Sequence, residues 1–237
     1  IIIDHHKLKT TKPDNCILIN PHVNDLGKED NPWYNLSASG LVFKFIHGFI
    51  KFRRESNDAL SYDFKLSKII DLAAMGILAD LVPLNGESRI LAQNGLKQMS
   101  NNNRMGIVEL KRVSKIESSS DCTSSDISFK IGPRINASGR LSNANLPVEL
   151  LLTNDSLVAK KTSELLESMN EERKIIERKI FNDAVDKTEK KENNHTGYIL
   201  YGEDWHTGIV GIVASRLTRK YNRPFIVLGN ENGYVKG

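Results

Sequence analysis

A long amphipathic pattern over residues 155–190 constrains the fold more than any other feature of the chain. Apolar side chains recur there at seven- and four-residue steps, with charged residues between them. They are Val158, Leu165, Met169, Ile176, Ile180 and Ala184. A helix of this length would extend about 50 Å at 1.5 Å per residue, which exceeds the width of a small domain. The pattern therefore predicts a helix that bridges two separate units.

Short apolar runs and further helical patterns alternate on both sides of this helix. The predicted strands are 1–3, 16–19, 127–131, 198–201 and 224–228. The other predicted helices are 37–54, 66–75, 87–99 and 208–221. Strands that alternate with helices are typical of α/β domains, in which short apolar strands form a buried parallel sheet. We therefore expect an α/β fold on each side of the bridging helix.

The composition of the chain limits the class of protein to which it can belong. A chain of 237 residues with 39% hydrophobic and 26% charged residues is ordinary globular protein, large enough for one good core or two modest ones. No apolar run approaches the roughly 18 residues that a membrane span requires, and no signal-peptide pattern is present. Cys16 and Cys122 have no metal or redox spacing, which fits a reducing cytosol. The net charge of +4 is compatible with a polyanionic partner without demanding one.

The first predicted strand ends in one carboxylate and two adjacent imidazoles, Asp4, His5 and His6. Ligands of α/β sheets bind just beyond the carboxyl ends of the strands, and this combination of side chains suits an ion such as Mn²⁺. Neighbouring side chains of a strand point to opposite sides, so one ion would not easily take both histidines. From these residues alone, a strand end with two surface histidines is an equally good interpretation.

Asp80 ends a small and apolar segment, 76–79, and precedes Leu81. A half-buried carboxylate is costly unless it meets a cation or strong hydrogen bonds. Its spacing alone favours a helix cap or an ion pair with an arginine over a metal ligand.

Residues 132–140 hold two arginines, Arg134 and Arg140, among small residues. Small residues allow close approach of a ligand to the backbone, and guanidinium groups match phosphate oxygens bidentately. This segment therefore predicts a phosphate site. Asn136 lies between the arginines and could bind sugar, phosphate or its own turn.

His206 stands between Trp205 and Gly208, at the start of the helix predicted for 208–221. An anion at such a helix N-terminus would find free amide groups and a favourable dipole. The alternative is a histidine packed at the edge of a domain.

The Asp-His-His motif and the segments 132–141 and 204–217 together resemble the RecJ family of the DHH phosphoesterase superfamily. The resemblance implies a DHH domain over 1–154, a connecting helix over 155–194 and a DHH-associated domain over 195–237. It implies a metal-dependent exonuclease that degrades single-stranded DNA in the 5′→3′ direction, in DNA repair and recombination. A groove between the domains, too narrow for duplex, would select single strands.

The resemblance also implies roles for individual residues. His5 would bind metal and Asp4 would orient it, while His6 would face the substrate phosphate. Asp80, as the terminal acid of the segment 71–84, would be the second metal ligand, with Asp71 as the alternative. The implied cofactors are Mn²⁺ or Mg²⁺ in a two-metal site.

On the substrate side, the family implies that Arg134, Arg140, Asn136 and His206 bind the nucleic acid. Single-stranded DNA is the expected partner, together with single-strand-binding protein or a helicase, in a bacterial cytoplasm.

The family takes further aspartate ligands from motifs that precede the Asp-His-His string, and substrate contacts from a Gly-Ser-Gly-Arg segment that this sequence does not include. We therefore expect an internal fragment of a longer enzyme, inactive by itself. Two rival hypotheses are another DHH phosphoesterase, acting on short oligonucleotides or cyclic dinucleotides, and a non-catalytic nucleic-acid-binding protein.

Overall fold

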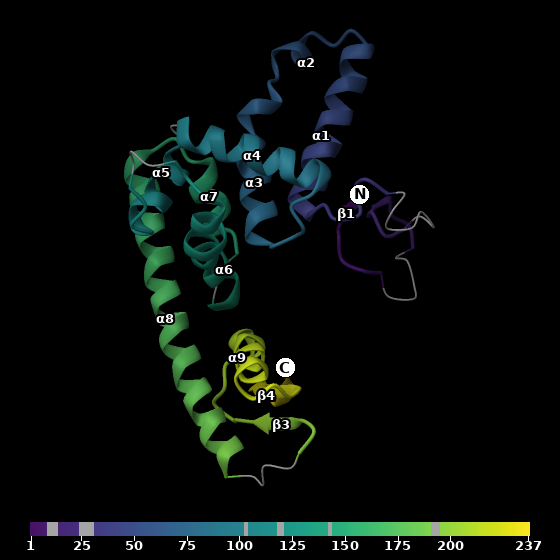
Figure 1. The fold of residues 1–237 in the computed structure, drawn as a ribbon. Coiled ribbons are helices and arrows are strands. Elements are labelled where there is room, and N and C mark those ends of the chain that lie inside the picture. Colours follow the sequence, from purple (N-terminus) through teal and green to yellow (C-terminus); the bar gives the residue numbers. More distant parts are fainter. Residues whose placement is uncertain (9–13, 24–30, 102–103, 118–120, 142–143, 191–194) are drawn as a thin grey trace. The chain divides into compact units, whose positions relative to one another are not determined.

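The structure, a computed structural model, describes residues 1–8, 14–23, 31–101, 104–117, 121–141, 144–190 and 195–237 (Figure 1). The chain divides into two compact units, Ile1–Pro133 and Arg134–Gly237. The domain boundaries expected from the sequence remain a prediction, and residues 191–194 of the expected connecting helix lie outside the described residues. In the described part of the chain, no helix is long and apolar enough to cross a membrane.

The first unit combines a small parallel sheet with several helices. Strand β1 (Ile2–Ile3) pairs in parallel with β2 (Leu18–Ile19), and Ile2 lies opposite Leu18. The helical elements that follow are α1 (Ala38–Glu55), α2 (Ala59–Asp63), η1 (Leu66–Lys68), α3 (Ile70–Ala79), α4 (Gly86–Asn101), α5 (Met105–Val113) and η2 (Asp126–Ile131). The sequence patterns predicted both strands and helices α1, α3 and α4 within a few residues.

Helix α3 is the centre of this unit because almost every side chain on it is small or apolar. Ile77 is fully buried, and Gly95 of α4 packs directly against α3. A Cβ atom on Gly95 would lie 2.1 Å from Cβ of Ala74 and 2.6 Å from the carbonyl oxygen of Ile70. The two helices can approach this closely only because position 95 has no side chain.

The segment predicted as a strand at 127–131 is helical instead. The π-helical turn η2 leads directly into α6 (Gly132–Leu141). The alternation was misleading, because Ile127 and Ile131 are both fully buried while Phe129 between them is 68% exposed. Side chains four residues apart share one face of a helix, whereas a strand would place Phe129 on that face as well.

The second unit consists of the remaining helices and a three-stranded sheet. Its elements after α6 are α7 (Leu146–Leu152), α8 (Ser156–Glu189), β3 (Tyr198–Tyr201), α9 (Thr207–Tyr221), β4 (Phe225–Glu231) and β5 (Tyr234–Lys236). The sheet order is β3-β4-β5, with β3 parallel and β5 antiparallel to β4. Helix α9 connects the parallel pair and packs between the sheet and the C-terminal half of α8 (Figure 1). The mixed α/β class and the long helix are confirmed, whereas α5, α7 and β5 were not predicted.

Caps determine where α8 and α9 begin. Asp155 accepts hydrogen bonds from the amide groups of Leu157 and Val158, at 2.8 and 3.2 Å. His206 precedes α9, and its ring Nδ1 accepts a hydrogen bond from the amide of Gly208. A capping side chain of this kind satisfies one of the free amide groups at a helix start. The cap on α9 thereby holds His206 at the helix N-terminus, as the sequence predicted.

Candidate metal and phosphate site

Asp4, His5 and His6 form a turn directly after β1. Oδ1 of Asp4 accepts hydrogen bonds from the amides of His5 and His6, at 2.8 and 3.3 Å, and lies 2.7 Å from Nδ1 of the His6 ring. Asp4 therefore contacts the main chain of His5 and the ring of His6, whereas the expected contact was with the His5 ring. Burial raises the pKa of Asp4, but these hydrogen bonds outweigh it, so the pKa lies below its usual value.

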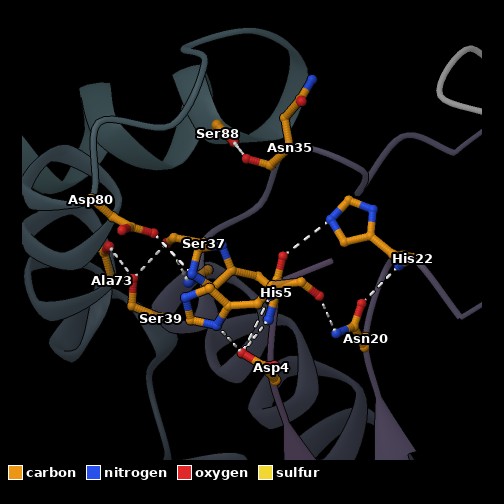
Figure 2. A network of polar contacts seen from close by, with 12 residues as sticks. Asp4, His5, Asn20, His22, Asn35, Ser37, Ser39, Ala73, Asp80 and Ser88 are labelled. Atoms are coloured by element: carbon orange, nitrogen blue, oxygen red, sulfur yellow. Dashed lines mark hydrogen bonds and ion pairs between the residues drawn. The ribbon is translucent and has the colours of Figure 1, made fainter. Parts of the chain in front are cut away.

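His5 and Asp80 converge in the first unit, as Figure 2 shows. Nε2 of the His5 ring lies 3.1 Å from Oδ2 of Asp80. The His5 side chain is 18% exposed and that of Asp80 is 43% exposed. Asp80 is the C-cap residue of α3, and its amide bonds back to the carbonyl groups of Gly76 and Leu78. Asp80 therefore both ends a helix and points its carboxylate at an imidazole.

This pair fits a divalent cation in chemistry and in spacing. An imidazole nitrogen and a carboxylate oxygen are common ligands for Mn²⁺. Adjacent ligands of an octahedral ion with bonds of about 2.1 Å are about 3 Å apart, which matches the distance here. Two protein ligands are fewer than a divalent ion coordinates, and the described residues contain no cluster of three or more His, Cys, Asp or Glu side chains.

The close packing of α1 on α3 brings Asp80 to the end of β1. The hydroxyl of Ser39, in the first turn of α1, donates to the carbonyl oxygen of Ala73 on α3 (Figure 2). A Cβ atom on Gly76 would lie 2.3 Å from that hydroxyl oxygen. Glycine at position 76 thus permits the helix contact that carries Asp80 to His5.

Asn20 and His22, which follow β2 and were not predicted as site residues, hold the main chain of this turn. Asn20 donates from Nδ2 to the carbonyl oxygen of His6 at 3.0 Å, and its own Oδ1 accepts from the amide of His22. The ring Nε2 of His22 lies 3.1 Å from the carbonyl oxygen of His5, so this nitrogen is the donor. The sequence contained a signal for Asn20 and His22, because both follow the second predicted strand. The carboxyl ends of parallel strands meet at one edge of a sheet, so these residues lie near the end of the first strand.

Asp71, the alternative metal ligand, lies at the other end of α3. Its carboxylate is fully buried and accepts from Nε and Nη2 of Arg104, at 2.8 and 3.3 Å. Nine residues of helix separate it from Asp80, which is about 13 Å. Asp71 therefore binds Arg104 and does not lie beside His5.

In the second unit, Arg140 and His206 meet at Gly208. Nη1 of Arg140 donates to the carbonyl oxygen of Gly208 at 2.9 Å, and His206 caps the amide of the same residue at 3.1 Å. His206 also lines a pocket of about 550 Å³ between α8 and the segment 202–206. Lys179 and Lys187 line that pocket together with three acidic residues, Asp183, Glu203 and Asp204, so its charge is mixed. Two of the predicted phosphate ligands are therefore neighbours.

Arg134 and Asn136 lie elsewhere on α6. A spacing of six residues rotates Arg134 by roughly 120° from Arg140 around the helix, so the two arginines do not share a face. Arg134 is 8% exposed, and its guanidinium binds the carboxylate of Glu167 on α8. Asn136 is exposed on the same helix.

Comparison with known proteins gives one consistent relationship. The chain is 33% identical over 242 aligned residues to the single-stranded-DNA-specific exonuclease RecJ of Bacillus subtilis, and 34% identical over 244 residues to that of Haemophilus influenzae. Each alignment includes the whole chain but only 28% and 42% of these relatives, respectively. The chain thus spans less than half the length of either relative. No family model matches the sequence.

Solved structures agree with the sequence comparison. A crystal structure of RecJ from Thermus thermophilus in complex with Mn²⁺ matches 95% of the chain with a TM-score of 0.78 and 25% identity, over 32% of that protein. A crystal structure of exonuclease RecJ bound to manganese matches 96% of the chain with a TM-score of 0.77 and 25% identity, over 54% of that protein.

Proposed function

Because the chain is a RecJ homologue over its whole length, we propose that it belongs to a metal-dependent exonuclease that hydrolyses single-stranded DNA in the 5′→3′ direction. The proposed biological role is DNA repair and recombination. One observation carries the proposal, namely the 3.1 Å distance between Nε2 of His5 and Oδ2 of Asp80. At this distance the imidazole and the carboxylate can be adjacent ligands of one ion, as a phosphodiesterase that uses manganese or magnesium needs.

In this proposal His5 and Asp80 hold Mn²⁺ or Mg²⁺. Such an ion lowers the pKa of a coordinated water and polarises the phosphoryl oxygen. The further ligands of a two-metal centre would come from residues other than those described. Asn20 and His22 keep the His5–His6 main chain in place through its carbonyl groups.

The remaining residues would act on the substrate. The carboxylate of Asp4 fixes the His6 ring through Nδ1, and this hydrogen bond is one of the contacts that lower the pKa of Asp4. That ring is 78% exposed, so its other nitrogen can reach a phosphate oxygen. Arg134 and Arg140 would bind phosphate groups of the nucleic acid, with His206 and Asn136 as further contacts.

Metal binding tests the first part of the proposal. We expect the 237-residue chain to bind Mn²⁺, and His5→Ala and Asp80→Ala each to weaken that binding at least tenfold, because each removes one of two ligands. Electron paramagnetic resonance of free Mn²⁺ in a titration measures this. His47→Ala and Asp63→Ala remove an exposed side chain of the same type from α1 and α2, and should bind like the parent chain. Unchanged Mn²⁺ binding in both site variants would contradict the proposed ligands.

Nuclease assays test the second part. The two donors are too few for a two-metal centre, so the chain by itself should release no 5′ nucleotides from single-stranded DNA in Mn²⁺. Release of nucleotides by this chain would show that expectation to be wrong. In a longer protein that includes this sequence, activity on dinucleotides and not on long single strands would favour a different DHH phosphoesterase.

Partners and location follow from the same relationship and are proposals as well. Single-stranded DNA is the proposed substrate, and single-strand-binding protein or a helicase would deliver it. A DNA exonuclease of this kind would work in the bacterial cytoplasm.

A further inference from the structure

Glu167 on α8 holds the most buried of the predicted phosphate-binding arginines. Its Oε1 accepts from Nη2 of Arg134 at 3.0 Å, and its Oε2 contacts Nε of the same guanidinium. The side chain of Arg134 is 10% exposed and that of Glu167 is 28% exposed. We propose that Glu167 is a positioning residue that orients the guanidinium of Arg134 toward a phosphate group of single-stranded nucleic acid. This inference rests on the proposed function.

The energetic argument starts from the burial of Arg134. A guanidinium removed from water without an acceptor carries a large desolvation cost, so Arg134 requires a partner in this environment. An arginine side chain also has many rotamers, and contact along the Nε and Nη2 edge selects one orientation of the planar group. Glu167 therefore fixes the orientation of the Arg134 guanidinium before a ligand binds. Binding then costs no further rotamer entropy at Arg134.

Charge alone and positioning predict opposite effects for the loss of Glu167. A carboxylate close to a phosphate site repels the ligand, so its removal should strengthen binding if only charge matters. If Glu167 positions Arg134, its removal should weaken binding, although the protein becomes more positive. The sign of the change therefore separates the two accounts.

The experiment measures binding of a fluorescein-labelled, 5′-phosphorylated oligothymidylate by fluorescence anisotropy at one fixed salt concentration. The 237-residue chain is compared with Glu167→Gln, Arg134→Ala and the double variant. Glu172→Gln is the matched control, because it removes the same charge from an exposed position of the same helix. We expect Glu167→Gln and Arg134→Ala each to lower affinity about tenfold, roughly the value of one charge-assisted hydrogen bond. The double variant should bind no more weakly than Arg134→Ala, and Glu172→Gln should bind as tightly as the parent.

Each outcome has a distinct meaning. If Arg134→Ala weakens binding but Glu167→Gln binds as tightly as the parent or more tightly, the positioning role is wrong and the proposed function stands. If the parent chain does not bind or Arg134→Ala has no effect, the phosphate role of Arg134 fails, and the inference fails with it. Circular dichroism establishes folding, and Glu167→Asp, which withdraws the carboxylate by one methylene, replaces Glu167→Gln if that variant does not fold.

Discussion

At the scale of single residues, His5 and His6 are adjacent but have different partners. The His5 ring points to Asp80, whereas the His6 ring points to Asp4, although the ring centroids are only 4.5 Å apart. Consecutive side chains at a strand end diverge, as the alternation of a strand requires. This divergence is consistent with the proposed roles of His5 in metal binding and of His6 in phosphate binding.

Asp126 gives a residue-scale prediction about pH. Its carboxylate accepts from the amide and hydroxyl of Thr123 and pairs with Lys130, which lowers its pKa to about 2. A carboxyl whose pKa is lower in the folded state than its unfolded value of 3.8 stabilises the fold above that value. The stabilisation is lost as the pH falls through about 2.

We expect Asp126→Asn to reduce the free energy of unfolding by at most about 2 kcal/mol at pH 7, since one pKa unit corresponds to about 1.4 kcal/mol. The difference from the parent should shrink from pH 5 downward and approach zero near pH 2. Urea unfolding at several pH values measures it. A difference that stays constant with pH would rule out this account.

At the scale of elements, α8 anchors α9 through one buried carboxylate. Glu177 is 9% exposed and accepts from Nη1 of Arg173 on its own helix and from Nη1 of Arg216 on α9, both at 2.8 Å. The guanidinium of Arg216 also lies over the ring of Phe181, 4.2 Å from its centroid. These contacts fix the docking of the helix whose N-terminus carries His206.

We expect Glu177→Ala to lower the free energy of unfolding by about 3 kcal/mol, because it leaves the guanidinium of Arg173, which is 13% exposed, without this partner. Glu172→Ala, at an exposed position of the same helix, should change it by less than about 0.5 kcal/mol. Denaturant unfolding monitored by circular dichroism compares the two variants. Equal effects of the two substitutions would show that the Glu177 contacts contribute little.

At the scale of the whole molecule, the positive charge is modest and much of it is paired. The net charge is +4, with 33 basic and 29 acidic residues. Several other arginines hold carboxylates: Arg53 with Asp58, Arg104 with Asp71, and Arg173 and Arg216 with Glu177. A broad electrostatic surface for a polyanion is therefore not expected.

Binding of single-stranded DNA should accordingly depend only weakly on salt. If Arg134 and Arg140 contact one phosphate each, the slope of log K against log salt should be roughly −1.4, from about −0.7 per phosphate on a single strand. Anisotropy titrations at several KCl concentrations measure the slope. A slope of about −4 or steeper would require many more contacts and contradict the small number of phosphate ligands.

The sequence by itself determined the elements whose information is local. The helical spacing of apolar residues in 155–190 predicted α8 correctly, although two of the residues that carried the prediction, Val158 and Leu165, are 44% and 46% exposed. The strand–helix–strand order of the C-terminal part was likewise predicted correctly. The alternation at 127–131 misled, because residues 127 and 131 share one face in a helix as well as in a strand.

Only the tertiary structure decided the partners of the polar side chains. His5 meets Asp80 across 75 residues of sequence, Arg134 meets Glu167 across 33, and His22 reaches the carbonyl group of His5. No local period records such pairs, because a hydrogen bond is directional and short, and its partner depends on how distant helices pack. The glycine contacts at positions 76 and 95 decide that packing, by allowing helix backbones to approach within a side chain's width of each other.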